Sequence, residues 1–180
     1  LGDKGVLLSG AGGSGKSGTT LAGIAHGLST AGDDYCLLTR REAVVAHPLY
    51  RILKQDPAGV ARAFGKADTP DFGKTNWQGK HEIHADLLPA SPFVNRLVIK
   101  ALLLPKVAHL PRSEFRPISA GAAMRSFAPS SVFQLPDDEE QGIRFAAALC
   151  RDLPCYELRL SEDAGEIAGS IRGFIEGLPA

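Results

Sequence analysis

Gly10-Ala11-Gly12-Gly13-Ser14-Gly15-Lys16-Ser17 is the stretch on which the expected fold depends. It fits the pattern of phosphate-binding loops, which is a glycine, four free positions and then Gly-Lys-Ser or Gly-Lys-Thr. Glycines allow the backbone to turn tightly, so that several amide N–H groups point inward at phosphate oxygens. In such loops the lysine reaches the β- and γ-phosphates, and the Ser or Thr hydroxyl binds Mg²⁺. The stretch therefore predicts a nucleotide-binding loop.

The segments on either side of this loop support the prediction. Residues 5–9 are apolar enough to form a short buried strand before the loop. After the loop, apolar residues recur at helical spacing at Leu21, Ile24, Ala25 and Leu28. The loop thus opens a helix whose positive end faces the anion. The alternatives are a chance match to the motif and a glycine-rich turn that binds a dinucleotide. The dinucleotide turn does not call for a Lys-Ser pair, and this sequence has no acidic residue at the end of a second strand to bind the ribose.

Composition limits the number of domains and the kinds of partner. At 180 residues and 44% hydrophobic content, the chain fits one domain, residues 1–180, with a substantial core. Lys plus Arg and Asp plus Glu both number 20, so the formal net charge is zero. A neutral chain gives no electrostatic reason to expect nucleic acid or an anionic membrane as the main partner.

The cysteines and the apolar runs bear on cellular location. Cys36, Cys150 and Cys155 have neither zinc spacing nor a paired framework, which indicates free thiols in a reducing compartment. The longest apolar run, residues 97–104, is interrupted by a lysine and is too short to span a membrane. The first strand begins almost at the first residue, so we expect no secretory leader and a missing upstream segment. The predicted location is cytoplasmic.

The rest of the chain alternates segments typical of strands and helices. Expected strands lie at residues 28–31, 35–39, 81–87, 95–107 and 156–160, with Pro105 ending the fourth. Expected helices lie at residues 16–27 (with room for one more turn), 60–64, 120–127, 137–149 and 164–178. Residues 40–55 have a partial helical pattern interrupted by Pro48, and turns, loops or connectors are expected at residues 32–35, 68–80, 112–117 and 128–131. This order predicts an α/β fold, a P-loop nucleotide-binding domain with a mixed sheet flanked by helices.

The pair Asp33-Asp34 is the second candidate feature. A nucleotide loop alone does not define a reaction, because switches, motors and kinases all use one. In the common P-loop scheme an Asp at the end of an apolar strand holds Mg²⁺ through water. The strand expected at residues 97–104 offers no such Asp, so the pair is the best replacement. One carboxylate can hold Mg²⁺ opposite Ser17 while the other accepts a proton from a hydroxyl; the alternative is a merely polar turn.

The loop followed by Gly32-Asp33-Asp34 resembles the HPr kinase/phosphorylase family and, more distantly, the phosphoenolpyruvate carboxykinases, which share its nucleotide fold. In HPr kinases the loop is likewise followed, after one helix and one short strand, by an Asp-Asp pair. The resemblance is specific up to this pair and rests beyond it on the order of elements. It implies that Asp33 is the catalytic base and that Asp34 binds Mg²⁺, beside the catalytic role of Lys16 and the Mg²⁺ binding by Ser17 that the loop motif predicts. It also implies a homo-oligomer, because known members form hexamers.

Two features of that family are absent from this sequence. HPr kinases carry a functional His on the strand before the loop, and this chain begins too close to its loop to contain it. They also carry a Glu-x-Arg-Gly-x-Gly stretch, which residues 38–117 do not contain. The expectation is therefore a divergent kinase of the same fold, with no commitment to HPr as acceptor.

Several further side chains are weaker candidates for contact with a ligand. His81 and His84 are expected on opposite faces of a strand, which argues against a metal pair. Lys80, Arg96 and Arg112 either contact the transferred phosphate or are solvated surface charges.

Two segments carry open alternatives. Residues 137–140 are acidic and are expected to cap a helix, with a cation site as the remote alternative. Trp77 lies in a polar loop, where it either stacks on an adenine or anchors the loop.

These observations predict an ATP-dependent, Mg²⁺-requiring phosphotransferase that acts on a hydroxyl, with a protein serine favoured over a small molecule as acceptor. The alternatives are a small-molecule kinase of the same fold and a regulatory module that binds a nucleotide without catalysis. The residues predicted to hold the nucleotide are Gly10, Gly12, Gly13, Ser14, Gly15, Lys16, Ser17 and Gly18.

Overall fold

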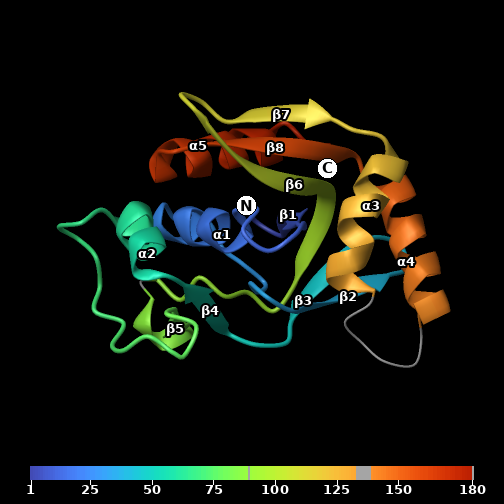
Figure 1. The fold of residues 1–180 in the computed structure, drawn as a ribbon. Coiled ribbons are helices and arrows are strands. Elements are labelled where there is room, and N and C mark those ends of the chain that lie inside the picture. The colour runs from blue at the N-terminus through green and yellow to red at the C-terminus, as the bar shows by residue number, and fades with distance from the viewer. Residues whose placement is uncertain (89, 133–138, 180) are drawn as a thin grey trace.

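The computed structural model describes residues 1–88, 90–132 and 139–179, and Figure 1 shows a mixed sheet flanked by helices. The strands are β1 (Lys4–Leu8), β2 (Cys36–Arg40), β3 (Val44–Pro48), β4 (Ile52–Gln55), β5 (His81–His84), β6 (Leu97–Leu110), β7 (Glu114–Pro117) and β8 (Cys155–Ser161). The helices are α1 (Lys16–Ala25), α2 (Pro57–Phe64), α3 (Ala120–Ser131), α4 (Glu139–Asp152) and α5 (Ala164–Glu176), with a 3₁₀ turn at Ala85–Leu87. The α/β class and the mixed sheet are as expected from the sequence.

The long strand β6 organises the main sheet. It pairs in parallel with β1 and with β8, and antiparallel with β3. The hairpin partner β2 extends the sheet beyond β3, and β7 extends it beyond β8. In the described part of the chain β1 pairs only with β6, so the strand that leads into the glycine-rich loop lies at an edge.

Alternate residues of β6 face two separate cores. Leu102 packs with residues of α3 and α4, whereas Ala101 and Leu103 pack with residues of α1 and α5. All three side chains are 0% exposed. The period of two along a strand thus explains why this apolar run serves a sheet that is covered on both faces.

A second, two-stranded sheet stands beside α1 and α2. Strands β4 and β5 pair antiparallel, with Leu53 opposite Ile83. These two side chains are 2% and 0% exposed and pack in one cluster with Leu21 of α1 and Val60 of α2. This small sheet therefore holds its strands in a fixed position next to the helix that follows the glycine-rich loop.

Strand β6 passes through Pro105, where the sequence predicts its end, so that prediction is wrong. The carbonyl of Leu103 accepts a hydrogen bond from Ser9 N–H (3.0 Å), and backbone groups of alternate residues point to the same edge of a strand. Pro105 therefore faces the β1 edge, and β1 has already ended at Leu8. The N–H group that proline lacks removes no ladder bond there, and β6 continues to pair with β8.

The partial helical pattern at residues 40–55 is also a wrong prediction. These residues include the last residue of β2 and the whole of β3 and β4. A bend closed by Arg41 N–H and the carbonyl of Ala43 (3.3 Å) joins β2 to β3. Val44 and Ala46 then face the core, with 5% and 3% of their surfaces exposed. The apolar residues of β3 and β4 happen to fall at helical spacing in the sequence, although the chain changes direction between the two strands.

Four shorter segments differ from expectation. Residues 28–31 form no strand, and Thr30 makes only an isolated parallel bridge with Phe93. Residues 112–117 include the edge strand β7, which is held because Phe115 stacks on Phe174 with ring centroids 4.3 Å apart. Residues 128–131 continue α3, since the residues on either side, 127 and 132, are both buried in the core. The strand expected at residues 81–87 ends at His84 and becomes the 3₁₀ turn.

The other predicted elements are confirmed within a few residues. Helix α1 ends just before Gly27, whose φ of +82° is a left-handed stop, and Leu28 does not extend it. Strands β2 and β8, helix α5 and the loop at residues 68–80 lie where predicted. The first two residues of the helix expected at 137–149 lie outside the described residues, and α4 is described from Glu139.

Candidate functional site

The glycine-rich loop connects β1 to α1 and requires glycine at its C-terminal end. Gly15 has φ +107°, in the left-handed region that L side chains rarely adopt. A Cβ atom at this position would lie 2.6 Å from Cδ1 of Leu160 on β8. The loop therefore lies directly against the sheet, and the close approach is the reason for glycine at position 15.

Lys16 is the first residue of α1 and its side chain folds back over the loop. Its Nζ donates hydrogen bonds to the carbonyl oxygens of Gly10 (2.7 Å) and Ala11 (2.9 Å). Gly15, at the N-cap, has no side chain to bond the N–H groups of the first helical turn. A cationic group and free helical N–H donors thus gather at one place, which is the arrangement that binds phosphate.

Two buried hydroxyl groups near this loop have no partner among the described residues. They are Ser14 Oγ in the loop and Thr19 Oγ1 in the first turns of α1. Buried hydroxyls in proteins are nearly always hydrogen-bonded, so a ligand or water is expected to satisfy them. Ser14 is one of the predicted nucleotide-binding residues, and Thr19 is not.

The carboxylate of Asp33 lies beside the loop's serine. The backbone N–H of Lys54 donates a hydrogen bond to Asp33 Oδ2 (3.2 Å), and the Ser17 hydroxyl lies close enough to this carboxylate to lower its pKa. Burial raises the pKa of Asp33 above its usual value, and the Lys54 N–H and the Ser17 hydroxyl act against the rise. Lys80 adds a smaller effect that also lowers the pKa of Asp33. Ser17 and Lys80 thus both lie near enough to Asp33 to act on its charge, and their predicted contacts with a metal ion or a phosphate stay predictions.

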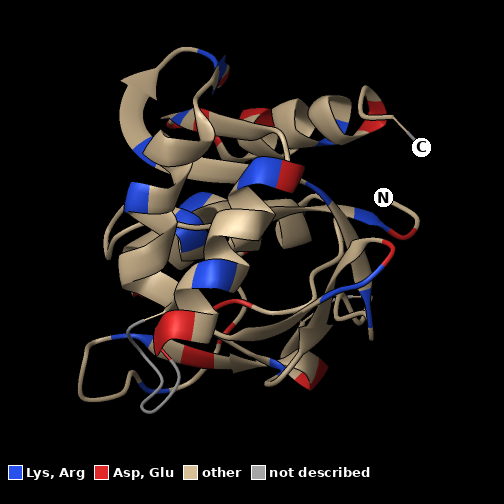
Figure 2. Cartoon of the chain, turned by 90° about the vertical axis from the view of Figure 1, so that its right-hand side faces the viewer, with Lys and Arg blue, Asp and Glu red and all other residues tan. Residues whose placement is uncertain are grey.

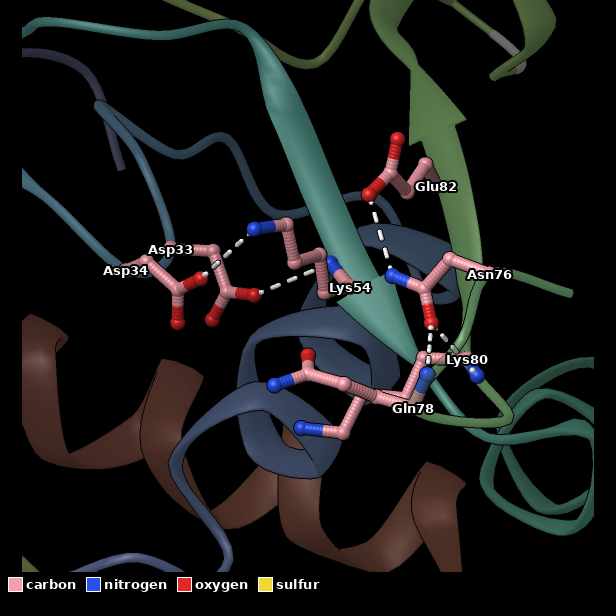
Figure 3. A network of polar contacts seen from close by, with 7 residues as sticks. All are labelled: Asp33, Asp34, Lys54, Asn76, Gln78, Lys80 and Glu82. Carbon is pink, nitrogen blue, oxygen red and sulfur yellow. Dashed lines mark hydrogen bonds and ion pairs between the residues drawn. The ribbon is translucent and has the colours of Figure 1, made fainter.

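Asp34 points to a different neighbour. Its Oδ2 lies 3.7 Å from Nζ of Lys54, and both side chains are partly exposed. Figure 3 shows the two carboxylates on one side of β4, with Lys54 reaching toward both. Lys54 was not among the predicted site residues, because it falls within the segment that shows a helical pattern. Recognition of the strand Ile52-Leu53-Lys54-Gln55 would have placed Lys54 on the face opposite the buried leucine.

Asn76 organises the turn that carries Lys80. Its side-chain oxygen accepts hydrogen bonds from the N–H groups of Gln78 (2.9 Å) and Lys80 (3.2 Å), and its Nδ2 donates to Glu82 (3.0 Å). Figure 3 shows this turn beside the end of β4. Trp77, within the turn, is 91% exposed, so its side chain does not anchor the loop against the residues that the structure describes.

A cavity of about 450 Å³ adjoins the loop and the acid pair. Lys16, Asp33 and Asp34 line it, together with apolar residues of β1, α3 and α5. Both β1 and β2 border it, and each of these strands is paired on one side only in the described part of the chain. The cavity therefore gives a small ligand or a peptide segment access to the two carboxylates.

The remaining candidates lie apart from this site. His81 packs edge-on against Phe72, and His84 is exposed at the other end of β5. Arg112 borders a separate hollow with Glu166, and no hydrogen bond or ion pair within the described ranges joins Arg112 or Arg96 to the loop or the acid pair.

The acidic segment at residues 137–140 is only partly described. Asp137 and Asp138 lie outside the described residues, and Glu139 and Glu140 occupy the first turn of α4, where acidic side chains favour the helix dipole. Glu140 pairs with Arg144 one turn later (2.5 Å). Figure 2 shows acidic and basic residues interspersed over the visible helices and loops.

The three cysteines are free, as predicted. Cys150 and Cys155 are buried, and burial raises the pKa of Cys150 to about 11, so this thiol is a poor nucleophile at neutral pH. In the part of the chain that is described, no helix combines the length and apolar character needed to cross a membrane.

The fold and the site define an α/β protein with a mixed sheet, a glycine-rich loop at a helix N-terminus and an acid pair beside it. No protein-family model, no curated protein and no solved structure matches the chain.

Proposed function

We propose that this protein is an ATP-dependent phosphotransferase that moves the γ-phosphate of ATP to a hydroxyl group, with a protein serine as acceptor. The observation that carries the proposal is that Lys16 of the glycine-rich loop and both carboxylates of the acid pair line one cavity, with the Ser17 hydroxyl near enough to Asp33 to lower its pKa. A loop that binds phosphate and a carboxylate pair at its serine are the parts that phosphoryl transfer needs.

The residues present fit Mg²⁺-ATP. The Ser17 hydroxyl and the adjacent carboxylate of Asp33 are oxygen ligands of the kind Mg²⁺ prefers, and Lys16 with the loop amides suits the phosphates. Within the described residues no group of three or more His, Cys, Asp or Glu forms a metal cage. Mg²⁺ in kinases needs none, because phosphates and water complete its coordination. When bound, the ion would neutralise charge on the β- and γ-phosphates.

The geometry favours one division of labour between the carboxylates. Ser17 lies beside Asp33, so Asp33 suits the metal side, and the exposed Asp34 is open to an incoming acceptor. Taken alone, the raised pKa of Asp33 would favour Asp33 as the base. The rise comes from burial, however, and a cation bound beside Asp33 would lower this pKa again. The family resemblance implies the opposite roles, with Asp33 as the base and Asp34 on Mg²⁺. Asp34 would accept the hydroxyl proton as the oxygen bonds to phosphorus and ADP leaves.

Transfer from γ-labelled ATP tests the function and the assignment together. With Mg²⁺ and a lysate of the native host, wild-type protein should label one discrete protein acceptor. Asp34→Asn should bind ATP normally but lose transfer by roughly 100-fold or more. Asp33→Asn should lose the Mg²⁺-dependent part of ATP binding. If Asp33→Asn instead binds ATP normally and loses transfer, while Asp34→Asn loses Mg²⁺-dependent binding, Asp33 is the base.

The same experiment separates the alternatives. Label that appears only on low-molecular-weight compounds would indicate a small-molecule kinase. Tight ATP binding by the wild type with no transfer to any acceptor would contradict phosphotransfer and favour a regulatory module.

A further inference from the structure

Lys54 contacts both members of the acid pair with different parts of the residue. Its backbone N–H donates to Asp33 Oδ2 (3.2 Å), and its Nζ lies 3.7 Å from Asp34 Oδ2. Figure 3 shows the side chain extended from β4 toward the carboxylates. One residue of the small sheet thus spans the two groups on which the proposed chemistry depends.

The backbone of Lys54 is held from both sides. Its neighbours in sequence, Leu53 and Gln55, are 2% and 8% exposed, and Lys54 itself pairs with Glu82 across the β4–β5 ladder. A residue anchored in this way has a fixed N–H direction and a fixed origin for its side chain. The position of the ammonium group therefore depends mainly on its own rotamers and on Asp34.

The ion pair between Lys54 and Asp34 is not a main source of stability. The side chains of Lys54 and Asp34 are 38% and 49% exposed, and exposed pairs of this kind contribute little to the free energy of unfolding. By contrast, a carboxylate on a short loop must be held in one orientation to accept a proton from a bound hydroxyl. The lysine is the cationic group that the described structure pairs with Asp34.

We propose that Lys54 is a positioning residue for phosphoryl transfer, which orients the Asp34 carboxylate through its ammonium group and fixes Asp33 through its backbone N–H. This inference rests on the proposed function. The backbone contact survives any side-chain substitution, so a change at residue 54 tests the Asp34 contact alone.

Kinetics of Lys54→Met and Lys54→Arg test the proposal. Lys54→Met should lower kcat by roughly 100-fold with KM for ATP unchanged, because the loop that holds ATP is not altered. Lys54→Arg keeps the cation and should recover most of the activity. Lys74→Met, a change at an exposed lysine in the loop between α2 and β5, serves as control and should match wild type. Thermal unfolding of all variants should agree closely.

A double-mutant cycle distinguishes positioning from a general loss. If Lys54 acts through Asp34, Lys54→Met should cause no further loss of transfer in the Asp34→Asn protein. Independent losses that multiply would overturn the inference, as would a Lys54→Met enzyme with wild-type kcat. Both of these results leave the proposed function intact. A wild-type protein that transfers no phosphate overturns the proposed function, and the inference with it.

Discussion

The glycine-rich loop and the acid pair meet at one site but are built in different ways. The loop is contiguous in sequence, and its lysine bonds to carbonyls of the same loop. The acid pair is held by Lys54 of the small sheet and lies near Lys80 of a separate turn. A local motif can thus be recognised from sequence alone, whereas a site assembled across elements needs the fold. The two halves should also respond differently to substitution.

The largest effect is expected from removal of the cation in the loop. Lys16→Ala should lower phosphate transfer by at least about 100-fold, because charge on the phosphates loses its nearest cation in the loop. Stability should change by only about 1 kcal/mol, since the two hydrogen bonds of Lys16 are partly exposed. Single-turnover transfer and urea unfolding measure the two quantities. Lys66→Ala, at an exposed position after α2, is the control. Full transfer by Lys16→Ala would contradict the assignment of the loop.

A side chain at Gly15 should damage the loop and the fold together. Gly15→Val places a Cβ near Leu160 and forces a left-handed φ on a branched residue, so we expect a loss of about 2–4 kcal/mol in unfolding free energy. Gly12→Ala, at a position with open space around its Cβ, should stay within about 0.5 kcal/mol of wild type. Equal stability of the two variants in urea unfolding would show that the loop does not rest on β8.

The smallest effect is expected at a hydrogen-bonded carboxylate outside both halves of the site. Burial acts to raise the pKa of Glu166, but hydrogen bonds from Ser161, Ser170 and Ser113 outweigh it and lower this pKa to about 2. Because the folded pKa lies below the ordinary value of 4.5, Glu166 stabilises the fold above pH 4.5. That contribution, about 1 kcal/mol for a partly exposed group, is lost as the pH falls from 4.5 toward 2.

Unfolding measured between pH 2 and 7 in wild type and Glu166→Gln checks this sign. The variant should be less stable at neutral pH, and its difference from wild type should vanish near pH 2. A constant difference across the range would rule out the hydrogen-bonded carboxylate as its cause. Phosphate transfer at neutral pH should be unchanged, because Glu166 touches neither the loop nor the acid pair.

The sequence predicted elements well where one pattern dominated. The phosphate-loop motif located the β1–α1 junction, and the alternation of β8 and the helical spacing of α5 led to correct elements. It failed where tertiary pairing overrides local preference. A proline stops a strand only where a neighbouring strand would need the N–H group that proline lacks. At Pro105 no such group is needed, because β1, the strand on that edge, has already ended. The helical spacing at residues 40–55 conceals two strands, because β3 also pairs with the distant β6 and β4 pairs with the distant β5.

The candidate site shows the same division. Asp33 and Asp34 were found because acidic residues close to a phosphate loop suggest metal and proton chemistry. Lys54 was missed because nothing local distinguishes it from other lysines, and its importance comes from the β4–β5 pairing that directs it. Thr19 carries no motif either, and only its burial without a partner among the described residues draws attention to it.

The contact between Gly15 and Leu160 links the loop to a strand near the other end of the chain. Among natural or selected variants, the two positions should not change freely. Position 160 can accept a smaller residue while the loop stays as it is, but a larger residue there would push against the loop backbone. If the loop binds a nucleotide as proposed, selection for that binding should therefore also constrain the volume of Leu160, a core residue on another strand.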